Sequence, residues 1–272
     1  MKKNVIVLSV VLILIASVLF LTLLENERTE EEQTEVLTGN SLGEFITDEV
    51  YNSPNDGEIH YGVYFPDDFD SNKEYDLYIT LPGYEGLYFQ GVGANLQADD
   101  FALNAVRMRK DLIVVAPQLE DWEETSANQT IALIEYFKSN YNINKVFASG
   151  YSAGGETMSL VMEKRADLID RYLQVSSKWD GDFEMTVENG VPVYFVIGQN
   201  DEYYGREPTK DAYLTLYSMY KRKGLSDEEI NKILILDIKK REYFLERGFD
   251  NEHGGGGLIA YDEDIMKWLL ND

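Results

Sequence analysis

The sequence of 272 residues contains no cysteine. A disulfide framework, a thiolate metal site and a cysteine nucleophile are therefore excluded. Only two histidines are present, His60 and His253, which leaves few nitrogen ligands for a metal ion. No loop follows the G-x-x-x-x-G-K-[ST] pattern of phosphate-binding sites. We therefore expect neither a metal site nor a cofactor.

Basic residues are scarce as well. The chain has 24 lysines and arginines against 49 aspartates and glutamates, a formal net charge of −25. Such a surface repels phosphate backbones, so the sequence predicts no nucleic-acid partner. The simplest role of the acidity is solubility, and the alternative is attraction of a cationic substrate or partner.

Charged residues are absent from residues 5–24, a stretch that follows Lys2 and Lys3. At about 1.5 Å per residue, a helix of this length spans roughly 30 Å, the thickness of a bilayer core. No convincing cleavage site follows, so residues 1–24 are predicted to form an uncleaved signal anchor, with a cleaved signal peptide as the alternative. The positive residues would stay in the cytoplasm, which places the rest of the chain outside it, or makes it secreted if the segment is cleaved.

Residues 25–43 are rich in glutamate and are predicted to form a solvated acidic linker. Residues 44–272 read as one domain in which strands and helices alternate, which indicates an α/β fold with a mostly parallel sheet. The expected strands are 58–65, 75–81, 112–116, 146–149, 172–175, 191–197 and 233–238. The expected helices are 128–140, 155–165, 209–223 and 262–270, with a short helix capped by Ser226 and Glu229.

A G-x-S-x-G pentapeptide spans residues 150–154, with Ser152 at its centre. It follows an apolar, β-prone run and precedes residues with helical spacing. A sharp strand–turn–helix connection of this kind forces its central residue into a strained backbone geometry and exposes the serine hydroxyl. A serine hydroxyl is a poor nucleophile at neutral pH and needs a neighbouring base. Of the two histidines, His253 lies in a polar loop before the last helix, whereas His60 lies in an early strand, where a structural role is simpler.

From about residue 55 to the C-terminus the chain resembles the α/β-hydrolase family, especially its compact esterase and prolyl-oligopeptidase-like branches. The resemblance rests on the pentapeptide, on Asp201 after a buried strand, on His253, and on their order along the chain. It implies a Ser152–Asp201–His253 catalytic triad. Asp180, Asp182 and Glu202 are alternatives for the acid, because acidic residues are frequent throughout this chain.

The resemblance also implies an oxyanion hole made of two backbone N–H groups. One is expected from Ala153, just after the nucleophile. The other is expected from the loop after strand 75–81, where Tyr84 is favoured and Gly83 and Glu85 are its neighbours. This loop lacks the histidine that related enzymes often carry, and Pro82 stands in its place.

Substrate preference is less well defined by the sequence. Only about fifteen residues separate the strands at 172–175 and 191–197, which predicts an open cleft without a large lid. Tyr151, Glu85, Trp179 and Tyr203 are predicted to contact substrate, although the aromatic residues equally suit packing. We expect a serine carboxylesterase acting on a small-molecule or polysaccharide-linked ester. A serine peptidase or amidase, or a non-catalytic surface-binding domain, remains the alternative.

Overall fold

The computed structural model of the protein describes residues 41–42 and 44–271. The predicted signal anchor and most of the predicted linker lie outside the described residues. Within the described part, no helix combines the length and the apolar character that crossing a bilayer requires.

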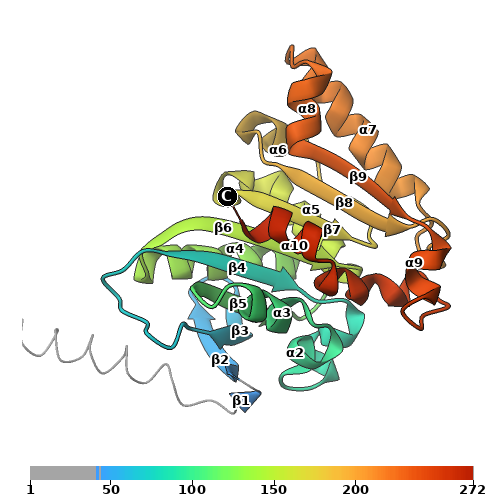
Figure 1. Ribbon diagram of the computed structural model, residues 1–272. Coiled ribbons are helices and arrows are strands. Elements are labelled where there is room, and N and C mark those ends of the chain that lie inside the picture. The colour runs from blue at the N-terminus through green and yellow to red at the C-terminus, as the bar shows by residue number, and fades with distance from the viewer. Residues whose placement is uncertain (1–40, 43, 272) are drawn as a thin grey trace, which may run out of the picture. The chain divides into compact units, whose positions relative to one another are not determined.

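A nine-stranded sheet forms the centre of the described residues, in the order β1-β2-β3-β5-β4-β6-β7-β8-β9 (Figure 1). Neighbouring strands from β5 through β4, β6, β7 and β8 to β9 are parallel, whereas β1, β2 and β3 add an antiparallel edge next to β5. The strands are β1 (Ser41–Leu42), β2 (Phe45–Ser53), β3 (Gly57–Tyr64), β4 (Tyr75–Leu81), β5 (Leu112–Gln118), β6 (Ile143–Tyr151), β7 (Arg171–Val175), β8 (Val193–Gly198) and β9 (Leu234–Lys239). This arrangement confirms the predicted α/β fold with a mostly parallel central sheet.

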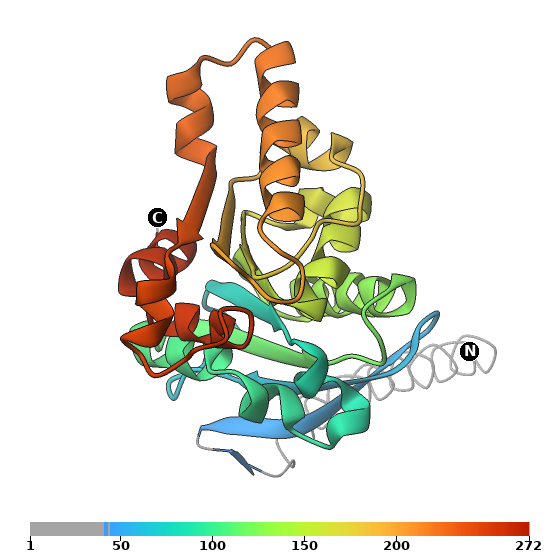
Figure 2. The ribbon, with the colours of Figure 1, turned by 90° about the vertical axis from the view of Figure 1, so that its right-hand side faces the viewer.

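Helices cover both faces of the sheet (Figures 1 and 2). One apolar core lies under α4, α5, α6, α7 and α8, and a second lies under α2, α3 and α10. The helices are α2 (Ala94–Ala98), α3 (Phe101–Met108), α4 (Glu124–Asn140), α5 (Ala153–Arg165), α6 (Glu184–Asn189), α7 (Glu207–Arg222), α8 (Asp227–Ile233), α9 (Arg241–Leu245) and α10 (Glu263–Leu270). The short 3₁₀ helices are η1 (Tyr84–Gly86), η2 (Tyr88–Gln90), η3 (Ala166–Leu168) and η4 (Gly254–Tyr261).

The central strands follow from their composition. Strand β5 is buried along its whole length, as an all-apolar strand covered on both faces should be. Each predicted strand and helix is present, with ends that differ by a few residues. Strand β2 is not among the expected strands, because Asp48 and Glu49 interrupt its apolar pattern.

The connection between β7 and β8 consists of a loop and the short helix α6, so no large lid is inserted there. The carboxyl ends of β4, β6, β7 and β8 therefore meet at one open edge of the sheet. In parallel sheets this edge is where ligand sites form.

Candidate active site

Ser152 occupies the sharp turn between β6 and α5. Its backbone has φ 51° and ψ −119°, a strained conformation for a residue other than glycine. A side chain at Gly154 would place its Cβ 2.3 Å from the carbonyl oxygen of Leu81, so only glycine fits there. The turn therefore packs directly on the end of β4 and holds the serine hydroxyl outside the regular hydrogen bonding of strand and helix.

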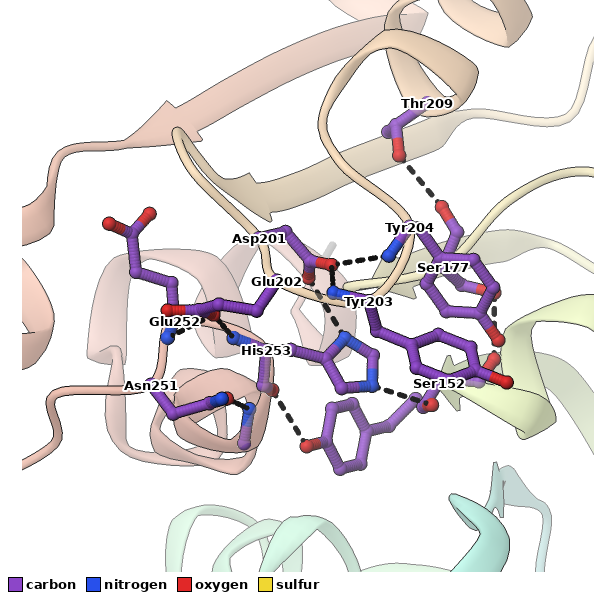
Figure 3. A network of polar contacts seen from close by, with 12 residues as sticks. Ser152, Ser177, Asp201, Glu202, Tyr203, Tyr204, Thr209, Asn251, Glu252 and His253 are labelled. Carbon is purple, nitrogen blue, oxygen red and sulfur yellow. Dashed lines mark hydrogen bonds and ion pairs between the residues drawn. The ribbon is translucent and has the colours of Figure 1, made fainter.

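The structure brings the three residues predicted as a triad into one hydrogen-bonded chain (Figure 3). Ser152 Oγ lies 3.0 Å from His253 Nε2, and His253 Nδ1 lies 2.9 Å from Asp201 Oδ2. In this arrangement the carboxylate accepts from the Nδ1–H, which leaves Nε2 free to accept the serine proton. These residues come from three segments, the β6–α5 turn, the loop after β8 and the loop before η4.

The Asp201 carboxylate is fully buried, and both of its oxygens accept hydrogen bonds. Oδ2 faces His253, and Oδ1 accepts the backbone N–H groups of Tyr203 at 3.1 Å and Tyr204 at 2.8 Å. Three donors and exclusion from water hold this carboxylate in one orientation.

The other acidic residues considered for this position lie elsewhere. Asp180 pairs with the Lys178 ammonium at 2.7 Å, and Asp182 is exposed to solvent. The Glu202 carboxylate instead accepts a hydrogen bond from the backbone N–H of His253 at 3.0 Å, so it contacts the main chain of the histidine and not its imidazole ring.

A cleft of about 690 Å³ opens above Ser152. Its lining residues are Gly83, Tyr84, Glu85, Trp122, Tyr151, Ser152, Ala153, Glu156, Lys178, Tyr203, Tyr204, Asn251, His253 and Gly254. Aromatic and polar side chains therefore dominate, and no aliphatic side chain larger than alanine is among them. In the described part of the chain, no group of three or more histidine, aspartate or glutamate residues is arranged to hold a metal ion.

Of the residues predicted to contact substrate, Tyr151, Glu85 and Tyr203 line this cleft, and Trp179 does not. Trp179 packs on the hydrophobic core, stacked on Phe183 with ring centroids 5.2 Å apart. This packing holds Trp179 in the core and away from the cleft, so we assign it no role in substrate binding. Trp122 lines the cleft instead.

The predicted oxyanion loop lies against the nucleophile. A Cβ built on Gly83 would be 3.7 Å from Ser152 Cβ, and Tyr84 begins the 3₁₀ helix η1. Ala153 begins α5. The first N–H groups of a helix have no partner within it, so the backbone N–H groups of Tyr84 and Ala153 are free of intrahelical bonds.

A second polar network lines the same cleft and was missed from the sequence. The Tyr204 hydroxyl donates to Glu156 Oε1, and Lys178 Nζ lies 3.3 Å from Glu156 Oε2. Burial raises the pKa of Glu156 despite these partners, and burial together with Glu156 holds the pKa of Tyr204 above its usual range. The three residues follow three different strands, so no local pattern indicates that they meet.

Neither a protein-family model nor the sequence of a curated protein matches the chain. Among solved structures it is similar to a thermostable esterase, with 18% identity and a TM-score of 0.68 over 83% of this chain and 62% of that one. It is also similar to the feruloyl esterase module from Clostridium thermocellum in complex with sinapinate, with 15% identity and a TM-score of 0.54 over 85% and 90%. Oligopeptidase B from Leishmania major shares 13% identity and a TM-score of 0.55 over 86% of this chain and 38% of its own.

These likenesses establish the fold. Together with the sheet order and the strand–turn–helix at Ser152, they define the described residues as an α/β-hydrolase fold.

Proposed function

We propose that this protein is a serine hydrolase, most simply a carboxylesterase. The observation that carries the proposal is the hydrogen-bonded chain from Ser152 through His253 to the buried Asp201, at the floor of an open cleft. Hydroxyl, imidazole and carboxylate in this order are the groups that nucleophilic acyl transfer requires.

In the proposed reaction, Ser152 Oγ attacks the ester carbonyl while His253 Nε2 accepts the hydroxyl proton. The Asp201 carboxylate stabilises the resulting imidazolium and does not take the proton itself. The imidazolium then gives the proton to the departing alcohol, which leaves an acyl-serine. Water, activated by the same imidazole, attacks the acyl group, and Ser152 is regenerated with release of the carboxylic acid.

Backbone donors complete the proposal. The N–H groups of Ala153 and Tyr84 are assigned to the oxyanion that forms on the carbonyl oxygen. Preorganised donors of this kind typically contribute about 3–4 kcal/mol to transition-state stabilisation. Glu85, Tyr151 and Tyr203 are assigned to substrate contact, because they line the cleft around the nucleophile.

The cleft supports a choice of substrate shape. Its open aromatic walls suit a small-molecule ester or an ester carried on a polysaccharide, since aromatic faces stack on planar acyl groups and on sugar rings. The lack of a long aliphatic wall disfavours long alkyl acyl chains.

We also propose that residues 1–24 anchor the protein in a membrane, with the catalytic domain outside the cytoplasm.

A labelling experiment tests the proposal. The full chain is treated with a fluorophosphonate probe, the adduct is mapped by mass spectrometry, and hydrolysis of p-nitrophenyl acetate is measured beside a matched p-nitroanilide. An adduct on Ser152 with ester turnover, both absent in Ser152→Ala, is the expected result. Faster anilide hydrolysis would favour the peptidase alternative. A folded protein with neither adduct nor turnover would favour the non-catalytic binding domain.

A further inference from the structure

Two short segments that meet at the His253 imidazole are joined by several hydrogen bonds. Residues 200–202 follow β8, and residues 251–253 precede η4. Between them run the Asp201–His253 contact and four further hydrogen bonds, which involve Asn200, Glu202 and Glu252. We call these two segments, residues 200–202 and 251–253, the histidine clamp.

Glu202 holds the clamp through the main chain of the histidine segment. Its Oε2 accepts the backbone N–H of Glu252 at 2.7 Å and that of His253 at 3.0 Å (Figure 3). Two donors converge on one carboxylate oxygen, and hydrogen bonds to a charged acceptor are stronger than those between neutral groups. Two adjacent residues of one loop therefore hold His253: Asp201 contacts the imidazole ring, and Glu202 accepts from the backbone N–H of the histidine.

Glu252 reaches in the opposite direction and is fully buried. Its carboxylate accepts the backbone N–H of Asn200 at 2.7 Å and the Asn200 side-chain amide at 2.9 Å, with Arg241 3.8 Å away. A buried carboxylate is unfavourable unless its oxygens are paired, so this residue binds the two segments together firmly.

The end of β8 is shaped to admit this buried glutamate. A Cβ built on Gly198 would lie 2.7 Å from Glu252 Cβ and 2.8 Å from its Oε2, closer than real contacts allow. The absence of a side chain at Gly198 therefore leaves the space that Glu252 fills. Positive φ does not explain this glycine, which is absent from the left-handed positions of the chain.

We infer that Glu202 and Glu252 are positioning residues, which fix His253 between Asp201 and Ser152 so that Nε2 stays within reach of the nucleophile. The inference rests on the proposed serine-hydrolase function. A shift of about 1 Å in a catalytic group lowers rates by about 10²-fold, so a loosened histidine segment should lower kcat. Substrate binding should change little, because Glu202 and Glu252 do not line the cleft.

Glu202 is the sharper residue to test, because its side chain is exposed and its removal leaves no core cavity. In Glu202→Ala both N–H groups lose their acceptor, and we expect kcat for p-nitrophenyl acetate to fall about 10–100-fold with KM within about twofold. Glu202→Gln keeps a carbonyl oxygen that can accept both bonds, and should restore kcat to within about threefold of the wild type. Glu207→Ala, an exposed glutamate paired with Arg206 and Lys210 on α7, is the matched control and should leave both constants unchanged.

Gly198→Ala is a second test variant, in which neither glutamate is substituted. The added methyl group should displace the Glu252 side chain and lower kcat with little change in KM, as in Glu202→Ala.

Two results would overturn the inference. One is wild-type kcat in Glu202→Ala. The other is a loss that Glu202→Gln does not restore and that is matched by a lower unfolding temperature, which would mark a purely structural role. Failure of the proposed function is a different result, since the wild-type chain itself would then show neither a Ser152 adduct nor ester turnover.

Discussion

A buried carboxyl group beside the active-site segments should make the stability of this protein depend on pH. Asp99 lies between α2 and α3, with only 7% of its surface exposed. Its Oδ1 accepts a weak hydrogen bond from Phe101 N at 3.4 Å, and its Oδ2 has no partner among the described residues. Burial, opposed only in part by that hydrogen bond, raises the pKa of Asp99 from 3.8 to about 7.

The sign and size of the effect follow from this shift. Between pH 4 and 7 the folded protein binds a proton at Asp99 that the unfolded chain has released, so stability falls as pH rises. Each pKa unit corresponds to about 1.4 kcal/mol, so the rise from 3.8 to about 7 gives a ceiling of about 4 kcal/mol above pH 7. About two pH units of the interval from pH 5 to pH 8 lie below the folded pKa of Asp99. Across this interval the free energy of unfolding therefore falls by about 3 kcal/mol.

Asp99→Asn removes the charge and should abolish this contribution. Urea unfolding of the full chain, followed by tryptophan fluorescence at pH 5 and pH 8, measures it as the difference between variant and wild type. We expect the variant to gain about 3 kcal/mol relative to the wild type on going from pH 5 to pH 8. The exposed Asp182→Asn is the matched control and should show no such gain. An equal pH slope in wild type and Asp99→Asn would refute the reasoning.

Three further predictions concern the site. Ser152→Ala should abolish fluorophosphonate labelling and lower turnover by orders of magnitude while leaving the unfolding temperature unchanged, and wild-type turnover in this variant would contradict the assignment. Asp201→Asn should lower kcat by about 10⁴-fold, as loss of a triad acid does, whereas Asp180→Asn should have little effect; kinetics that reversed this order would move the acid to Asp180. Trp122→Leu should raise KM with little effect on stability, because Trp122 lines the cleft. Trp179→Leu should lower stability with little effect on KM, because Trp179 packs against the core. Paired kinetic and thermal-unfolding measurements decide between these two outcomes.

Local sequence accounts for much of the fold. The strand before Ser152, the turn through it and the helix after it are encoded within residues 143–165, by apolar periodicity and by glycines where side chains do not fit. The buried strand β5 and the capped helix α8 are likewise determined by their own residues. Periodicity and capping act over a few residues, so they can be read without knowing the partners.

Tertiary structure decided which distant residues meet. The sequence offered several acidic residues for the contact with His253, and strand order brings the loop after β8, with Asp201, to the imidazole. The same order places Trp122 in the cleft and Trp179 in the core, although both are aromatic residues that follow strands. Burial of Glu252 against Gly198 cannot be predicted locally, because a glutamate in a polar loop is expected to be solvated. The space that the side chain fills is left by Gly198, at the end of β8. The sequence by itself therefore determines the local strands, turns and helices and which residues could be catalytic. Which of these residues contact one another depends on long-range packing.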